Sequence, residues 1–323
     1  MRRRVLRVAV VLAAAVPALT AFGCSSADDD PALGATPTAV TQAPALSRPR
    51  LCGPLRMTVL GRAAAPAATE LSGLVLSSDQ PGVLWTHNDS GDRPRIFALR
   101  PDGTPLADLA VPGAEAVDWE DLALGPDPAR PGGRALYLAD IGDNRATRET
   151  VTVYRVPEPA ASAAATGSTA PAVALTLRYP DGPHDAETLL VDPRTGALVV
   201  VTKQLSGESG VYVTRAAPAG PAERTLRAAG TLHLGFGGLA TGGDVSADGR
   251  VVVVRTYAAA FAWIRRPGAS LAGTLRRAPC RAGASLAAEG QGEALALSAH
   301  GSAMFTVAEG SASPVRRYAP RPR

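Results

Sequence analysis

Short apolar runs alternate with turns along most of the chain, and the alternation recurs at long intervals. Three runs begin alike, as Trp-Glu-Asp-Leu-Ala-Leu at residues 119–124, Ala-Glu-Thr-Leu-Leu-Val at 186–191 and Gly-Glu-Ala-Leu-Ala-Leu at 292–297. Each is followed by a turn and a second apolar run, which is the pattern of a β-hairpin. A hairpin that recurs at a long period indicates a repeat architecture and, for an all-β chain, a propeller.

Five turns rich in Gly, Pro, Asp and Ser separate the first two strands of five predicted blades. The turns lie at residues 77–82, 125–133, 192–196, 246–249 and 298–301. Third strands are expected at residues 95–99, 151–156, 210–214, 261–264 and 315–318, and fourth strands at 106–111, 172–177, 224–234 and 270–275. The Ala, Ser and Thr tract at 160–170 predicts a surface loop. Five blades are favoured, and six are the alternative if two repeats are merged in this assignment.

The fifth predicted blade lacks a fourth strand of its own. We expect residues 55–60, which precede the first blade, to supply it and close the ring, since closure removes open sheet edges. Closure would bring Cys52 close to Cys280, at the end of the fourth blade. In an oxidising compartment this proximity predicts a Cys52–Cys280 disulfide, with two unrelated buried thiols as the alternative.

The first 23 residues have the pattern of an export signal. Four Arg residues precede an apolar stretch that is short for a membrane span. Cys24 follows in a context that resembles the bacterial lipoprotein box, in which the cysteine is acylated. Residues 24–50 have no periodic apolar pattern and predict a disordered tether, which leaves 51–323 for the propeller domain. We therefore expect an exported protein held by a lipid at the outer face of the cell membrane, with cleavage and secretion as the alternative.

Charge argues against a nucleic-acid partner. The chain has 33 Lys and Arg residues and 29 Asp and Glu residues. Removal of the four Arg residues of the signal would leave 29 of each sign. A basic surface of the kind that binds nucleic acid is therefore not expected.

The propeller would gather polar residues at one rim, because the loops that enter the first strands and the loops after the second strands lie on the same face. The aligned repeat positions are Ser72, Glu120, Glu187, Thr241 and Glu293. The candidates for contacts with a small-molecule, glycan or protein ligand are His87, Asn88, Lys203, Arg255, Glu293 and Glu309. We expect these residues to surround an acidic channel mouth.

Carboxylates gathered at one mouth require neutralisation, since two of them about 4 Å apart repel by roughly 1 to 4 kcal/mol. Their pKa values rise, Arg or Lys pairs with them, or a cation binds. Hard oxygen donors suit calcium or magnesium, so Ca²⁺ is the candidate cofactor. The hypothesised ligands are Asp89, Asp140, Asp143, Glu120 and Glu187. A polar network that joins the blades without a metal is the alternative.

Other catalytic signatures are missing from the sequence. It contains no Gly-x-Ser-x-Gly elbow, no phosphate-binding Gly-x-x-x-x-Gly-Lys loop, no His-Glu-x-x-His and no Cys-x-x-Cys. The remaining candidates for acid-base catalysis are Glu120, Glu187 and His184.

Four segments resemble the recurring signatures of secreted and lipid-anchored bacterial propeller proteins, which are mostly uncharacterised. The segments lie at residues 85–92, 118–121, 141–144 and 184–187, with the sequences Trp-Thr-His-Asn-Asp-Ser-Gly-Asp, Asp-Trp-Glu-Asp, Ile-Gly-Asp-Asn and His-Asp-Ala-Glu. More remotely, the chain is similar to phytase-like and esterase-like propellers, in which calcium and substrate phosphate meet at an acidic channel mouth. The resemblance implies a ligand-binding propeller or, alternatively, a metal-dependent phosphoester or ester hydrolase. The chain lacks the cluster of Lys and Arg that several phosphates would need.

Overall fold

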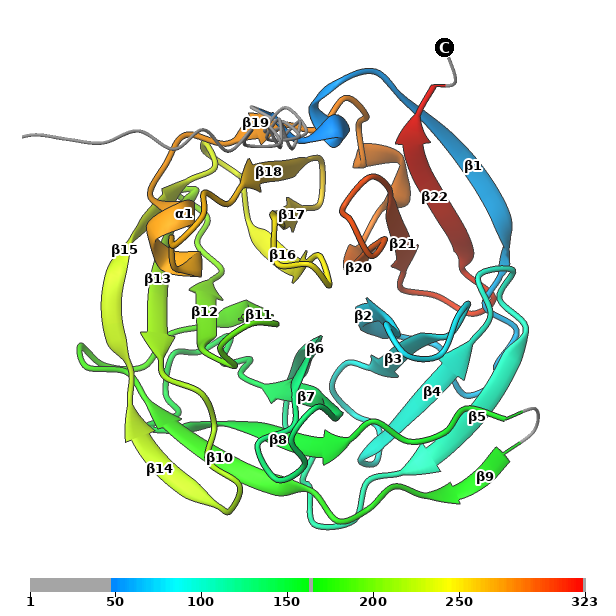
Figure 1. The fold of residues 1–323 in the computed structure, drawn as a ribbon, viewed down its shortest axis with the longest axis vertical. Helices are drawn as coiled ribbons and strands as arrows, with labels where there is room; N and C mark the ends of the chain where they lie inside the picture. The colour runs from blue at the N-terminus through cyan, green and yellow to red at the C-terminus, as the bar shows by residue number, and fades with distance from the viewer. Residues whose placement is uncertain (1–47, 163–164, 322–323) are drawn as a thin grey trace, which may run out of the picture. The chain divides into compact units, whose positions relative to one another are not determined.

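Five sheets surround a central axis in the computed structural model, which describes residues 48–162 and 165–321 (Figure 1). The innermost strand of each sheet lies nearest the axis. These strands are β2 (Leu71–Leu76), β6 (Trp119–Pro126), β11 (Ala186–Val191), β16 (Ala240–Val245) and β20 (Gly292–Leu297). The protein is an all-β propeller of five blades, so the predicted fold is confirmed and the six-bladed alternative is wrong.

Each blade continues outward through three further strands. In the first three blades these are β3 (Leu84–Asn88), β4 (Arg95–Leu99) and β5 (Pro105–Ala110); β7 (Arg134–Asp140), β8 (Val151–Pro157) and β10 (Val173–Arg178); and β12 (Leu198–Thr202), β13 (Glu208–Thr214) and β15 (Arg227–His233). The fourth blade adds β17 (Val251–Thr256), β18 (Ala260–Ile264) and β19 (Cys280–Arg281), and the fifth adds β21 (Met304–Ala308), β22 (Pro314–Pro320) and β1 (Leu55–Arg62). Short 3₁₀ helices lie at Arg50–Cys52 and Ala287–Glu289. Among the described residues no helix is long and apolar enough to cross a membrane.

The N-terminal strand β1 (Leu55–Arg62) closes the ring, as the sequence predicts. It pairs antiparallel with β22, from Leu55 opposite Pro320 to Arg62 opposite Pro314. Cys52 and Cys280 form a disulfide, and their Cα atoms are 5.8 Å apart. The bond links the segment ahead of β1 to the outermost strand of the fourth blade. The predicted signal, Cys24 and nearly all of the predicted tether fall outside the described residues.

Two connections leave their own blade and pair with the preceding one. β9 (Ala165–Ser168) runs parallel to β5, and β14 (Ala222–Thr225) runs parallel to β10. The expectation of a surface loop at 160–170 is therefore wrong for Ala165–Ser168, and the predicted strand 224–234 is divided between two sheets. The cause is the outer strand of each blade, whose free N–H and C=O groups pair with any extended segment that reaches them.

The predicted strand at residues 270–275 is also wrong, because this segment forms a short helix, α1 (Leu271–Leu275). The hydroxyl of Ser270 accepts a hydrogen bond from the backbone N–H of Gly273, which caps the helix at its N-terminus. The fourth blade is completed instead by β19, which pairs with β18.

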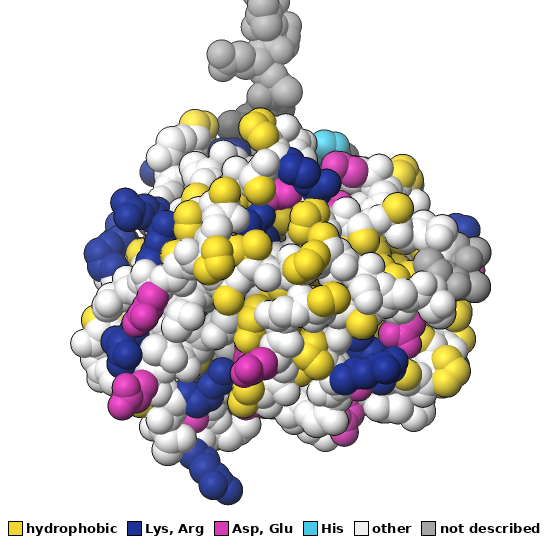
Figure 2. All heavy atoms as spheres, turned by 90° about the horizontal axis from the view of Figure 1, so that it is seen from below, with side chains coloured by type: hydrophobic (Ala, Val, Ile, Leu, Met, Phe, Trp, Pro, Cys, Tyr) yellow, Lys and Arg dark blue, Asp and Glu magenta, His cyan; other side chains and the backbone are white. Residues whose placement is uncertain are grey.

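The core lies between neighbouring blades. Leu122, Leu136 and Leu138 of the second blade pack with Trp85 and Ile96 of the first, and all five are fully buried. Because the inner strands are covered on both faces, their apolar runs are nearly continuous and do not alternate with polar residues. The outer surface is mixed: on the side of the propeller seen in Figure 2, acidic and basic side chains are interspersed with apolar ones.

Ring closure yields the first prediction. Replacing both cysteines, as Cys52→Ser with Cys280→Ser, should lower the free energy of unfolding by about 3 kcal/mol, because the bond closes a very long loop in the unfolded chain. Urea unfolding at neutral pH measures the change. Dithiothreitol should shift the wild-type midpoint and leave that of the double variant unchanged; a wild-type midpoint indifferent to reduction would contradict the prediction.

Candidate cation site at the channel mouth

Each innermost strand contains a β-bulge, which determines the direction of the side chains at the channel mouth. In β6, β11, β16 and β20 the pairing register shifts around the repeat position, at Glu120, Glu187, Thr241 and Glu293. In β2 the shift falls at Gly73, next to Ser72. A bulge leaves one residue unpaired and redirects its side chain. All five repeat positions are buried.

Three carboxyl groups from three blades converge at this mouth. Asp89 follows β3 in the first blade, Glu120 belongs to β6 in the second, and Glu293 belongs to β20 in the fifth. One oxygen from each lies within 4.8 Å of the others. Glu120 and Glu293 are only 3% and 4% exposed, whereas Asp89 is half-buried. The sequence placed all three at the rim, although Glu293 was proposed there for ligand contact and not for metal binding.

Several oxygens in this group lack a hydrogen-bond donor. Asp89 Oδ1, Glu187 Oε2 and Glu293 Oε2 are buried, and no described residue donates to them. A buried acceptor without a partner costs about 1 to 3 kcal/mol, more if it is charged, and most such groups in proteins are satisfied. Neighbouring carboxyl oxygens whose lone pairs accept no hydrogen bond are suited to coordinate a cation.

Burial raises the pKa values of the group, and mutual repulsion raises them further. Burial, with the charge of Glu293 next, raises the pKa of Asp89 to about 7. The same two causes raise the pKa of Glu187 to about 8, although Lys203 opposes them. The pKa of Glu120 lies well above its ordinary value because of burial and then Glu187. Burial also raises the pKa values of Asp118, Glu293 and Glu309.

Lys203 supplies a positive charge beside this group. Its Nζ contacts Glu187 Oε1 and lies 5.7 Å from the centre of the Tyr257 ring. Tyr257 in turn donates a hydrogen bond to Glu293 Oε1 over 3.0 Å. Sequence analysis missed Tyr257, which follows β17 directly and therefore occupies a second-to-third-strand connection like the other candidates.

Asn88 and Asp140 hold the loops that enter the inner strands. The side-chain oxygen of Asn88 accepts hydrogen bonds from the backbone N–H groups of Thr69 and Glu70, at 3.1 and 3.2 Å. Asp140 has the equivalent position in the second blade, where it accepts from the N–H groups of Val117 and Asp118. Because these hydrogen bonds use the side-chain oxygens of Asn88 and Asp140, neither residue belongs to the group of three converging carboxyl groups.

Asp140 and Asp143 are also tied to Arg148. The Arg148 guanidinium lies 2.8 Å from Asp140 Oδ1. The Arg148 backbone N–H donates to Asp143 Oδ2 over 2.6 Å, and the Asp143 N–H donates to Asp185. The structure therefore separates these two hypothesised metal ligands from the group formed by Asp89, Glu120 and Glu293.

The two candidate histidines lie in different environments. His87 is fully buried and its ring meets Trp119 edge-on at 5.4 Å. Burial lowers the pKa of His87 to about 4, so the ring is neutral near pH 7. His184 instead contacts Asp181 and the Tyr212 hydroxyl, at 3.0 and 2.8 Å. These partners place His184 beside the third strand of its blade.

Arg255 is a buried structural residue. It is fully inaccessible, and its guanidinium donates to Glu289 over 3.1 Å and to the Ala294 carbonyl over 2.9 Å. Glu289 also accepts from Thr306 and Tyr318. Glu309 remains close to the acidic group, since after burial the charge of Asp89 is the next cause of its raised pKa.

No family model matches the chain. No curated protein matches it either. Among solved structures, the gluconolactonase XC5397 from Xanthomonas campestris is 14% identical, with a TM-score of 0.45 over 82% of this chain and 89% of that one. A putative 6-phosphogluconolactonase from Bacteroides uniformis is 14% identical, with a TM-score of 0.39 over 77% and 67%, and U3-55K is 11% identical, with 0.39 over 83% and 100%.

Repulsion at the mouth yields the second prediction. Without divalent cations, Glu120→Gln should stabilise the fold at pH 8 by about 1 to 4 kcal/mol, the size of one close carboxylate repulsion. The raised folded pKa gives the sign: the stability of wild type is fully present below the ordinary pKa of an unfolded glutamate and is lost as pH rises from there through the folded pKa. The gain over wild type should therefore shrink towards pH 5. Urea unfolding in chelator across this range measures it.

Glu149→Gln is the matched control, because the Glu149 side chain is 82% exposed. Its difference from wild type should be small at every pH. A Glu120→Gln variant that is no more stable than wild type at pH 8 would refute the repulsion.

Proposed function

We propose that the propeller binds a divalent cation, Ca²⁺ in the first instance, between Asp89, Glu120 and Glu293. The observation that supports this most strongly is the convergence of their oxygens within 4.8 Å, from three blades. Asp89 Oδ1 and Glu293 Oε2 have no hydrogen-bond donor among the described residues. Carboxylate oxygens are the ligands that Ca²⁺ prefers. A bound cation would replace the repulsion among these groups by attraction and favour their ionised forms.

The bound cation would complete a binding site for a ligand at the channel mouth. A small molecule, glycan or protein segment with oxygen donors could reach the cation while contacting neighbouring side chains such as Lys203 and Tyr257. We propose no nucleic-acid partner, because the mouth is acidic.

We further propose that the propeller acts outside the cytoplasm, at the outer face of the cell membrane, anchored through a lipid on Cys24. The Cys52–Cys280 disulfide supports export, since such bonds persist in oxidising compartments. The anchor itself rests on the sequence of the first 24 residues.

Calcium binding yields the third prediction. Added Ca²⁺ should raise the midpoint of thermal unfolding, and at one hundred times its Kd the stabilisation should be about 2.7 kcal/mol. Asp89→Asn and Glu293→Gln should each abolish most of this response, whereas Glu149→Gln should keep it. Binding should tighten from pH 6 to 8, because the pKa of Asp89 near 7 makes protons compete with the cation.

Calorimetry at pH 7 in two buffers of different protonation enthalpy should show proton release on binding. An unchanged midpoint in 10 mM Ca²⁺, or equal responses of the site variants and Glu149→Gln, would rule out the cation site.

A metal-dependent ester or phosphoester hydrolase is the second candidate, favoured by one observation on Glu187. This residue is buried in the same acidic group, and burial raises its pKa to about 8. Lys203 contacts its Oε1, whereas no described residue donates to its Oε2. A carboxylate with a pKa near neutrality can accept a proton from water. A bound cation would polarise the substrate oxygen.

The hydrolase candidate yields the fourth prediction. With Ca²⁺ present, the protein should cleave a p-nitrophenyl ester or phosphoester, and Glu187→Gln should lower kcat by about 100-fold or more, the usual contribution of a general base. The Ca²⁺ affinity of the same variant should stay within a few-fold of wild type. If wild-type protein that binds Ca²⁺ cleaves these substrates no faster than buffer does, the hydrolase candidate is refuted and the cation-binding function is retained.

A further inference from the structure

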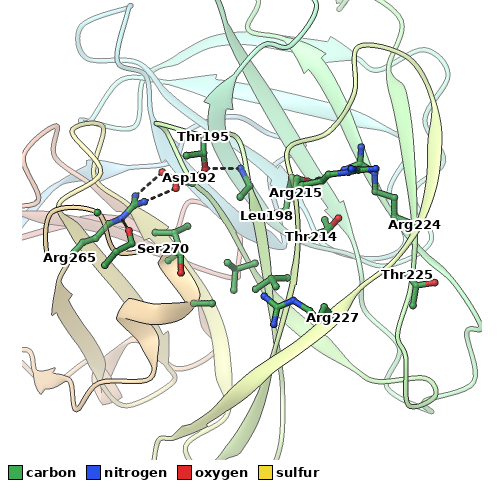
Figure 3. Close-up of a pocket in the computed structure, with 17 residues that line it drawn as sticks. Asp192, Thr195, Leu198, Thr214, Arg215, Arg224, Thr225, Arg227, Arg265 and Ser270 are labelled. Carbon is green, nitrogen blue, oxygen red and sulfur yellow. Dashed lines mark hydrogen bonds and ion pairs between the residues drawn. The ribbon is translucent and has the colours of Figure 1, made fainter. Parts of the chain in front are cut away.

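A second cavity, unrelated to the acidic mouth, lies between the third and fourth blades. Its volume is about 700 Å³, within the range of sites that enclose small organic ligands. It opens where the chain leaves β13, pairs with the second blade as β14 and returns as β15 (Figure 3). The opposite wall comes from the fourth blade, at Arg265 and the start of α1.

The lining carries positive charge that no acidic side chain of residues 48–162 or 165–321 neutralises. Arg215, Arg224 and Arg227 line the cavity, and none forms an ion pair with a described residue. The acidic group of the lining, Asp192, is already engaged, since its two oxygens lie 2.7 and 2.8 Å from the guanidinium of Arg265. The three positive charges therefore lack a described counter-charge, although Arg224 and Arg227 each use one guanidinium nitrogen to donate to backbone carbonyls.

Two of these arginines are held next to each other. Arg224 donates to the backbone carbonyls of Arg215 and Ala216, at 3.0 and 2.7 Å, and the Arg215 and Arg224 side chains lie on the same side of the cavity (Figure 3). Burial and then the charge of Arg215 lower the pKa of Arg224. Like charges placed together favour an anionic partner, and the planar guanidinium matches carboxylate, phosphate and sulfonate groups.

The rest of the wall is apolar. Leu198, Val199, Leu271 and Ala272 are buried side chains that face the same cavity, and Val213 is half-buried beside them. An inorganic ion would leave this wall exposed to water, whereas a ligand with an apolar body would bury it, which favours binding.

We propose that this cavity binds a small organic anion, with its carboxylate, phosphate or sulfonate group against Arg215 and Arg224 and its apolar body against Leu198, Val213 and Leu271. Arg227 would add a further positive charge to the lining. The site is independent of the cation site, because the two have opposite charge and share no residue.

Two fluorescent probes of similar shape test the proposal with the full chain. The anionic probe is 8-anilino-1-naphthalenesulfonate, and the neutral one is N-phenyl-1-naphthylamine. We expect saturable binding of the sulfonate at one site per chain and binding of the neutral probe at least tenfold weaker. Arg215→Gln should weaken sulfonate binding by about tenfold, the effect of one charge-assisted hydrogen bond. Arg227→Gln should weaken it a few-fold, because it removes one positive charge from the lining. Both side chains are exposed, so neither variant should disturb folding, which circular dichroism checks.

Arg56→Gln is the matched control, since Arg56 is an exposed arginine on β1, in the fifth blade. Its sulfonate affinity should equal that of wild type. The proposal is overturned if the sulfonate fails to saturate, if the neutral probe binds equally well, or if Arg56→Gln weakens binding as much as the two cavity variants do.

Discussion

Five inner strands converge on one axis, and the small space between them governs the rest of the structure. Side chains that point inward there must find a hydrogen-bond or ionic partner or be removed from water unpaired. The hydroxyls of Ser72 and Thr241 donate hydrogen bonds to backbone carbonyls of the next blade. The carboxyl groups of Asp121 and Asp244 accept hydrogen bonds from the backbone N–H groups of Leu189 and Leu297, which also belong to the next blade. Bulged strands joined side to side in this way form the channel wall.

The three glutamates at the same repeat positions cannot all be satisfied in this manner. Their backbones are fixed by the bulges, so their carboxyl groups are held together by the fold and not by mutual attraction. Burial and repulsion raise the pKa of every member, and Lys203, Tyr257 and Arg255 offset this rise only in part. Such a group is preorganised for a cation. Binding would remove the repulsion between the carboxylates, and it would not cost the entropy of ordering them, because the fold already holds them together.

Sequence patterns predicted the blades and the closure because both depend on local signals and on one topological requirement. Turn residues mark each hairpin, and the missing fourth strand of the last blade left residues 55–60 as its source. The strands β9 and β14 were not predictable in the same way, since edge pairing uses backbone groups that every residue has. The site divides similarly. The repeat positions of Glu120 and Glu293 followed from alignment, but the hydrogen bonds that occupy Asp140 depend on which loop N–H groups face it.

Both candidate sites arise where the chain departs from the regular blade. The acidic mouth depends on bulges that interrupt the inner strands, and on connections such as the one that carries Asp89. The arginine cavity depends on β14, which carries Arg224 out of the third blade and pairs it with β10 of the second. In a propeller the backbone N–H and C=O groups are hydrogen-bonded by repeated strand pairing, so the backbone of the regular strands can vary little. Chemistry specific to one protein therefore concentrates where the pairing is interrupted, and these two interruptions produce sites of opposite charge on one scaffold.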